Sequence, residues 1–209
     1  LGMYEDYPFW QALFESCGIN AVLSSPSTFK NYEEGVHSVM SDNICFPAKL
    51  VHSHIYELIN RGVDRIFFPY AIFERCESKQ TDNSFNCPIV AGYSDVLKSA
   101  INPDIPIDAP VINFKDESLL KKCCIEYLSQ LGIERGQIKK AFIQALQAQN
   151  EYEQSICQLN QDVYKSAVAA WQLTVLLAGR PYHADPLVQH KLSEMIADMG
   201  VNVITEDIM

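Results

Sequence analysis

Three cysteines lie in or beside predicted loops, where a thiol is free to bind a metal ion: Cys45, Cys76 and Cys87. Cys76 follows the strand-like run RIFFP, and Cys87 precedes a proline and a second strand-like run. Open α/β sheets usually place their sites in loops at the carboxyl ends of strands. The three thiols could therefore converge at one edge of a sheet and, as thiolates, bind a metal.

Cys45 stands two residues before Pro47, which suits the first turn of a helix. Its thiol would lie beside the positive end of that helix, where backbone N–H groups and the helix dipole stabilise a thiolate. Cys87-Pro88 is similar to the Cys-Pro pairing beside some iron-sulfur ligands. The spacing of the three cysteines matches no compact zinc or ferredoxin motif. Two alternatives therefore stay open: metal ligands, or small residues that fill loops.

The other four cysteines, Cys17, Cys123, Cys124 and Cys157, fall in or next to predicted helices among apolar residues. We expect them to pack in the core as small hydrophobic side chains. An odd total of seven cysteines, in a chain expected to be cytoplasmic, indicates free thiols or metal ligands in place of a disulfide framework.

The helix predicted after Cys45 carries two further candidates, Lys49 and His52. At about 100 degrees per residue, one apolar face is formed by Leu50, Val51, Ile55 and Leu58. His54 falls at the edge of this face, so we expect a hydrogen-bonded histidine in or just below the surface. His52 lies on the flank and Lys49 nearly opposite, which leaves both open to a ligand or simply to solvent.

A second candidate site is AGRPYHADP, residues 178–186, which follows the strand-like run TVLL. Arg180 could bind a phosphate or carboxylate through paired hydrogen bonds, and Tyr182 and His183 could orient a ligand. Asp185 followed by Pro186 has the form of a helix N-cap and first turn, so we assign Asp185 to capping.

A helix, a glycine and a strand follow one another three times, in FWQALFESCGINAVLSS, LVHSHIYELINRGVDRIFFPY and HKLSEMIADMGVNVITED. In each phrase the glycine can end the helix in the left-handed conformation. Further strands are predicted at the start of CPIVAGYSDVLKSAI and in PVINF, and residues 172–205 form one βαβ unit. This order predicts an α/β fold with a parallel sheet covered by helices.

We therefore expect two Rossmann-like α/β lobes, at residues 1–116 and 171–209, joined by a helical segment over residues 117–170. Apolar spacing predicts one long helix from about 137 to 171, after interruptions near Gly132 and Gly136. The second lobe is incomplete. The chain begins at Leu1 and ends just after a strand-like run, so we expect a piece of a longer polypeptide.

The charge composition of the chain indicates which kinds of partner are not expected. The chain has 26 acidic and 16 basic side chains, for a net charge of -10, and no Lys/Arg cluster that could follow a phosphate backbone. Nucleic acid and anionic membranes are therefore not expected as partners. The apolar runs are shorter than the roughly 20 residues of a spanning helix, and no signal peptide opens the chain. A cytoplasmic protein is expected.

Common catalytic fingerprints are missing from the chain. It contains no G-x-x-x-x-G-K-[ST], G-x-G-x-x-G, H-E-x-x-H or G-x-S-x-G motif. No ATP site is therefore expected in these 209 residues.

Several separated motifs, in order, resemble one known family. They are YEDYPFW at residues 4–10, DNICFPAKLVH at 42–52, NCPIV at 86–90 and GRPYH at 179–183. Together they resemble the uncharacterised domain that follows the ATPase modules of large 2-hydroxyacyl-CoA dehydratase activase-related proteins. The likeness extends over most of the chain.

This resemblance implies a relative of the dehydratase subunits, which hold an iron-sulfur cluster through cysteine thiolates. It places Cys45 and Cys87 in matching motifs, with Cys76 as the third ligand position. The implied partner is an ATP-hydrolysing activase module, in the same or another chain, and the implied substrate is an acyl-CoA or another small molecule. A cluster of this kind can be lost on purification in air.

The preferred hypothesis is thus an iron-sulfur electron-transfer or reductase domain that works with an ATP-driven activase. One alternative is a non-catalytic docking or regulatory domain of the activase, with the cysteines buried. Another is a module that binds CoA or phosphate at Arg180 and His183. No residue is assigned as a general base.

Overall fold

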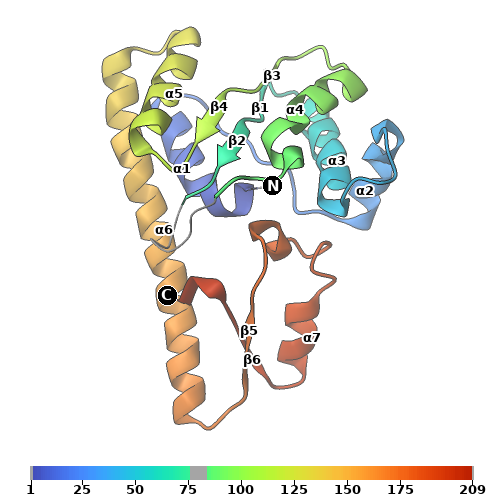
Figure 1. The fold of residues 1–209 in the computed structure, drawn as a ribbon, viewed down its shortest axis with the longest axis vertical. Coiled ribbons are helices and arrows are strands. Elements are labelled where there is room, and N and C mark those ends of the chain that lie inside the picture. The colour runs from blue at the N-terminus through green and yellow to red at the C-terminus, as the bar shows by residue number, and fades with distance from the viewer. Residues whose placement is uncertain (1, 76–83, 209) are drawn as a thin grey trace.

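The computed structural model describes residues 2–75 and 84–208. Its longest element is helix α6 (Arg135–Ala169), which runs along one side of the molecule in Figure 1. The preceding elements gather around the first half of α6, and the following ones lie along its second half. The long helix predicted from the apolar spacing is therefore confirmed.

The N-terminal part, residues 2–130, is mostly helical, and its described residues, 2–75 and 84–130, form two small sheets. Strand β1 pairs with β3 and strand β2 pairs with β4, both in parallel. Its elements are α1 (Met3–Ser16), α2 (Phe29–Gly35), η1 (Val36–Ser38), α3 (Phe46–Asn60), β1 (Ile66–Phe67), β2 (Tyr70–Phe73), α4 (Pro88–Ile101), β3 (Ile107–Asp108), β4 (Val111–Asn113) and α5 (Glu117–Gln130).

The C-terminal part, residues 172–208, is a βαβ unit, as predicted. Strand β5 pairs in parallel with β6 over four residues. Its elements are β5 (Thr174–Leu177), η2 (Pro181–Ala184), α7 (Leu192–Asp198), β6 (Asn202–Thr205) and η3 (Glu206–Ile208). The fold is therefore mixed α/β. In the described residues the parallel pairing forms three two-stranded sheets, in place of the continuous covered sheet that we expected.

Two apolar clusters form the core of the N-terminal part. One joins α1, α5 and the first half of α6, and Phe9, Leu128 and Phe142 are almost fully buried in it. The other joins α3 and α4 to β1 and β3, around Ile55 and Leu97. The second cluster packs α3 against α4, the two helices that begin directly after Cys45 and Cys87.

The helix-glycine-strand phrases are confirmed twice. Gly62 follows α3 and Gly200 follows α7, with φ of 73° and 77°, and each leads into a strand. The first phrase differs, because residues 19–28 form no strand after Gly18. Side chains bind this backbone where a neighbouring strand would: the Glu57 carboxylate accepts from Ser25 N at 3.0 Å, and Arg61 donates to Leu23 O.

The strand predicted after Cys87 is also absent, since α4 begins at Pro88. Pro88 sits in the first turn, where its missing N–H costs no hydrogen bond, and Asn102 ends the helix in the left-handed conformation. Gly132, with φ of 85°, separates α5 from α6 as predicted, whereas Gly136 lies inside the first turn of α6.

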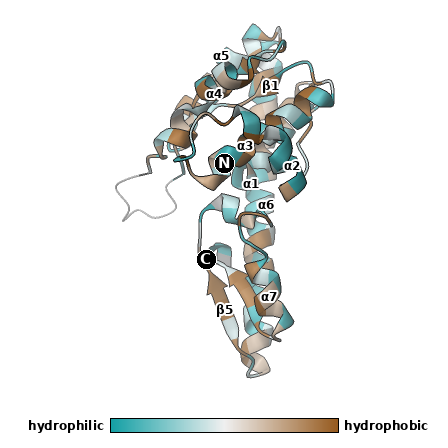
Figure 2. Ribbon diagram, turned by 90° about the vertical axis from the view of Figure 1, so that its right-hand side faces the viewer, coloured by the Kyte–Doolittle hydropathy of each residue, from teal (hydrophilic) through white to brown (hydrophobic). Residues whose placement is uncertain are grey.

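Figure 2 shows polar and apolar residues intermixed along α6 and α7. Among the residues described, no helix is both long and apolar enough to cross a membrane.

Candidate functional site

Cys45 and Cys87 occupy equivalent positions, as the N-caps of α3 and α4. Both residues are extended, with φ/ψ of -63°/150° and -66°/158°, both are exposed, and each is followed by a proline in the first helical turn. Neither thiol is used to cap its own helix. Both sulfurs thus stand at positive helix ends, as was predicted for Cys45, with no bond to those helices.

Helices α3 and α4 are packed against each other and run in the same direction (Figure 1). Ile44, directly before Cys45, and Ile89, two residues after Cys87, pack against the same apolar cluster. Farther along, His52 Nε2 of α3 lies 2.9 Å from the Tyr93 hydroxyl of α4. The thiols therefore lie at the same end of a helix pair.

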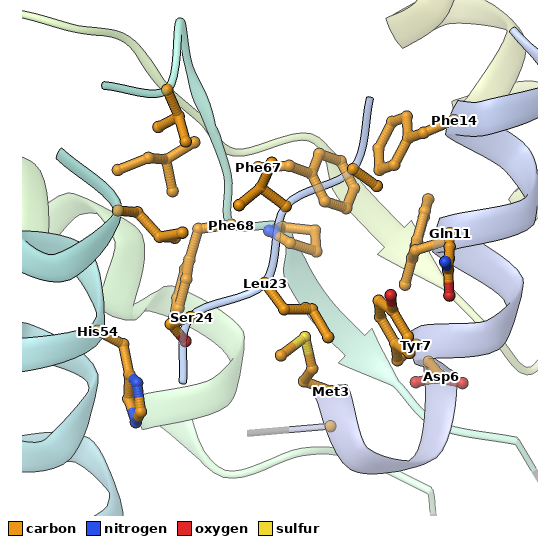
Figure 3. Close-up of a pocket in the computed structure, with 18 of the residues that line it drawn as sticks. Met3, Asp6, Tyr7, Gln11, Phe14, Leu23, Ser24, His54, Phe67 and Phe68 are labelled. Carbon is orange, nitrogen blue, oxygen red and sulfur yellow. The ribbon is translucent and has the colours of Figure 1, made fainter. Parts of the chain in front are cut away.

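A cleft of about 1370 Å³ opens beside this helix pair. Its walls come from α1, the segment 19–27, α3 and the β1–β2 region, and Pro47 and Val90 bring the first turns of α3 and α4 to its lining. Tyr182, Asp185 and Val188 of the C-terminal part complete it. Figure 3 shows part of this lining.

Most of the cleft lining is apolar. Phe14 and Phe67 lie on one side in Figure 3, Phe68 and Leu23 lie near the middle, and His54 and Ser24 lie at the other end. Such a lining favours a ligand with an apolar body and few polar groups.

One carboxyl group in the cleft has an unusual environment. Asp6 of α1 is only 4% exposed and lies 3.3 Å from Arg75 Nη2, while Arg75 also pairs with Glu153 of α6 at 2.5 Å. Burial and then the neighbouring Glu74 carboxylate raise the pKa of Asp6 to about 8, against the opposing effect of Arg75. Asp6 therefore holds a proton near neutral pH.

A buried polar joint connects the two parts of the chain at the rim of the cleft. Asp185, 3% exposed, accepts from the Tyr4 hydroxyl at 2.8 Å and from Ser27 N at 3.3 Å. Burial acts to raise the pKa of Asp185, but the hydrogen bonds from Ser27, Tyr4 and two backbone N–H groups hold it below the usual value. Asp185 is therefore a carboxylate anchored by both parts.

His54 extends this joint, since its Nε2 lies 2.9 Å from Ser27 Oγ. The prediction of a hydrogen-bonded histidine near the surface is confirmed, because His54 is partly buried. Burial lowers the pKa of His54, and the Asp185 and Glu57 carboxylates oppose that effect.

The structure corrects the prediction for His52. It was predicted to be open to solvent, yet it is completely buried, because α2 and α4 both pack against α3 and widen the buried face beyond the apolar residues. Its ring contacts Ser38 and Tyr93, which leaves no surface for a ligand. Lys49 is partly exposed and stays a candidate.

The second predicted site, around Arg180 and His183, lies on the surface. Both residues are exposed, and His183 Nδ1 accepts from the Arg180 backbone N–H at 2.7 Å, so one ring nitrogen is used within the turn. Asp185 caps a turn through Leu187 N and Val188 N, but α7 begins only at Leu192. The predicted capping role of Asp185 thus holds for a turn and not for α7, and its other oxygen accepts from Tyr4.

Cys76 lies outside the described residues. In the part of the chain that is described, no group of three His, Cys, Asp or Glu side chains is arranged to hold a metal ion. Cys45 and Cys87 are thus the two predicted ligands that the structure places. Cys17 and Cys124 are buried and Cys123 and Cys157 partly so, which fits packing for the first pair most clearly.

Sequence reasoning overlooked Asp6, Tyr4 and Tyr93. Tyr4 and Asp6 belong to YEDYPFW, where the surrounding aromatic residues indicate a buried helix but give no sign of a polar contact. Tyr93 is six residues after Cys87, a spacing that had meaning only once that segment was recognised as a helix.

The structure is a mixed α/β domain in which two exposed thiols precede helices whose first turns line a cleft. The chain belongs to the family of the CoA enzyme activase uncharacterised domain (DUF2229), whose model matches residues 1–209. The resemblance drawn from the sequence motifs is thereby confirmed, and the domain is associated with CoA enzyme activases. Neither the curated proteins nor the solved structures contain a match to it.

Proposed function

We propose that this domain binds an iron-sulfur cluster through Cys45 and Cys87 and transfers electrons in a system driven by an ATP-hydrolysing CoA enzyme activase. The observation that carries the proposal is the placement of two exposed thiols as the N-caps of two adjacent helices beside a cleft. Family membership supplies the activase context.

The donor set fits such a cluster in its chemistry. Thiolates are the usual ligands of iron-sulfur clusters, and the N–H groups of a helix N-terminus favour the charged form of a nearby thiol. Cys76 precedes Cys87 in the chain segment between β2 and α4, so we propose it as a third ligand. ATP hydrolysis is assigned to a separate module, because this chain carries no Walker motif.

The cleft provides what a reductive reaction needs besides electrons. When bound, the cluster would supply electrons one at a time. Apolar walls formed by Phe14, Phe67 and Phe68 exclude water from a bound molecule, and Asp6 holds a proton at its carboxyl group near neutral pH. These residues would bind and shield the molecule that is reduced.

Anaerobic reconstitution of the protein tests this proposal. Iron and sulfide are assayed per chain, and the reduced sample is measured by electron paramagnetic resonance. We expect a cluster in the wild type and its loss in Cys45→Ser and Cys87→Ser. Cys157→Ser is the matched control, since this thiol lies on α6 and accepts from Gln161 Nε2 at 3.3 Å. Equal iron content in all four proteins would contradict the proposal.

A further inference from the structure

A buried chain of hydrogen bonds runs from α2 through α3 to α4. Ser38 Oγ donates to Gly35 O at 2.9 Å and lies 2.7 Å from His52 Nδ1, and His52 Nε2 lies 2.9 Å from the Tyr93 hydroxyl. His52 is fully buried, and Tyr93 and Ser38 are 3% and 9% exposed. No water is needed to complete these bonds.

The direction of each bond follows from the protons available. Ser38 has one hydroxyl proton, which goes to Gly35 O, so its oxygen accepts from an Nδ1–H of His52. The neutral ring then carries no proton on Nε2, which accepts from the Tyr93 hydroxyl. Donor and acceptor are matched at every step, so the chain defines a single arrangement of the three side chains.

Gly35, whose carbonyl ends this series of hydrogen bonds, packs closely against the backbone of α3. A Cβ atom at this position would lie 2.6 Å from Ser53 Cα and 2.9 Å from the His52 carbonyl carbon. Only glycine permits this approach of α2 to the α3 backbone. The Ser38 acceptor is therefore held at a set distance from His52.

We propose that His52 and Tyr93 are positioning residues that hold the Cys45 and Cys87 thiols in register for a shared metal centre. This inference rests on the proposed function and extends it to residues that do not touch the metal. Their bond joins the seventh residue after Cys45 to the sixth after Cys87. At a rise of about 1.5 Å per residue, the bond lies roughly 10 and 9 Å along the two helices.

A metal centre tolerates only small changes in the positions of its ligands, so the register of α3 against α4 matters. A slip of one helix past the other by a single residue would move its thiol by about 1.5 Å, whereas metal–ligand distances vary by only about 0.2 Å. The apolar contacts of α3 and α4, such as Ala48 and Leu97, resist separation of the helices but are not directional. The His52–Tyr93 bond is directional, so it selects one register.

Tyr93→Phe is the main test, because it removes one hydroxyl and keeps the ring. Tyr127→Phe is the matched control, since it removes the same group from a tyrosine of α5, whose hydroxyl donates to Asp108 of β3 at 2.7 Å. The first measurement is retention of iron by reconstituted protein against a chelator. We expect about a three- to tenfold loss in Tyr93→Phe, the range for one neutral hydrogen bond, and none in Tyr127→Phe.

A second measurement needs no iron. Phenylarsine oxide binds two neighbouring thiols, and mass spectrometry identifies the cysteines that hold it. We expect capture by Cys45 and Cys87 in the wild type and weaker capture in Tyr93→Phe. Ser38→Ala, at the far end of the hydrogen-bond chain, should show a smaller effect in the same direction, and it replaces Tyr93→Phe if that variant fails to fold.

The outcomes separate the two claims. Unchanged iron retention and arsenical capture in Tyr93→Phe and Ser38→Ala would overturn the positioning role and leave the cluster in place. A wild type that captures the arsenical but holds no iron would overturn the proposed function alone. A wild type that holds neither iron nor the arsenical would contradict both.

Discussion

The hydroxyl of Tyr4 donates to Oδ2 of Asp185 at 2.8 Å, although the two residues are 181 positions apart in the chain. This bond joins α1 to the connection between β5 and α7, at the rim of the cleft. Asp185 has almost no exposed surface, whereas Tyr4 is 39% exposed, so the bond is partly buried.

Tyr4→Phe should lower the free energy of unfolding by about 1.5–3 kcal/mol, the usual contribution of a hydrogen bond to a charged group. Chemical denaturation measures the change. Tyr164→Phe, at an exposed position on α6, is the matched control and should have no effect beyond about 0.5 kcal/mol. Equal stability of the two variants would show that the bond between Tyr4 and Asp185 does not stabilise the fold.

Gly35→Ala should destabilise the protein by roughly 1–3 kcal/mol, because its methyl group would overlap the α3 backbone at Ser53. Gly92→Ala is the control. Gly92 lies inside α4 with open space around it, so alanine there should stabilise the helix by up to about 1 kcal/mol. Thermal unfolding of both variants would reveal the expected opposite signs. A neutral Gly35→Ala would mean that α2 does not pack closely on α3.

Asp6 should make stability depend on pH. Its pKa is raised to about 8 in the folded chain, so between about pH 4 and 8 the folded state binds a proton that the unfolded state releases. The free energy of unfolding therefore falls as pH rises through this window. Asp6→Asn removes that loss, so its stability relative to the wild type should rise with pH and level off above about 8.

Asp64→Asn is the control for this pH series, because Asp64 lines the same cleft but is exposed. Unfolding in urea across the pH range gives the comparison. Parallel curves for the wild type and Asp6→Asn would contradict the raised pKa.

Thiol reactivity should follow burial. Cys124 is 1% exposed, and burial raises its pKa from 9.0 to about 12, followed by the effects of Cys123 and Cys17. At neutral pH this leaves roughly a thousandfold less thiolate than in an ordinary cysteine. Pulsed alkylation with mass spectrometry should label Cys45 and Cys87 first and Cys124 only on unfolding. Early labelling of Cys124 in the folded protein would contradict its placement in the core.

Local patterns were enough to predict most helices. The apolar spacing predicted α6, and the glycines after α3 and α7 predicted where those helices end. Strand pairing depends on distant residues, which explains the error in residues 19–28. Their backbone groups are bound by Glu57, Arg61 and Asp185, and no local pattern reveals those partners.

The site could be predicted only in part, because it too depends on residues that are distant in the chain. Cys45 before Pro47 signalled a helix start, but the β-branched residues after Cys87 favoured a strand and concealed the equivalent cap. The burial of His52 depends on two helices that pack against α3 from elsewhere in the chain. A helical wheel, which considers one helix alone, placed it on the surface.

Whether Cys45 and Cys87 together hold iron can be seen in a crystal structure of the anaerobically reconstituted protein, with anomalous scattering measured at the iron edge. We expect an iron peak within bonding distance of both the Cys45 and Cys87 sulfurs, beside the first turns of α3 and α4. Iron bound elsewhere, or two thiols with no iron between them in a protein that has retained its iron, would contradict it.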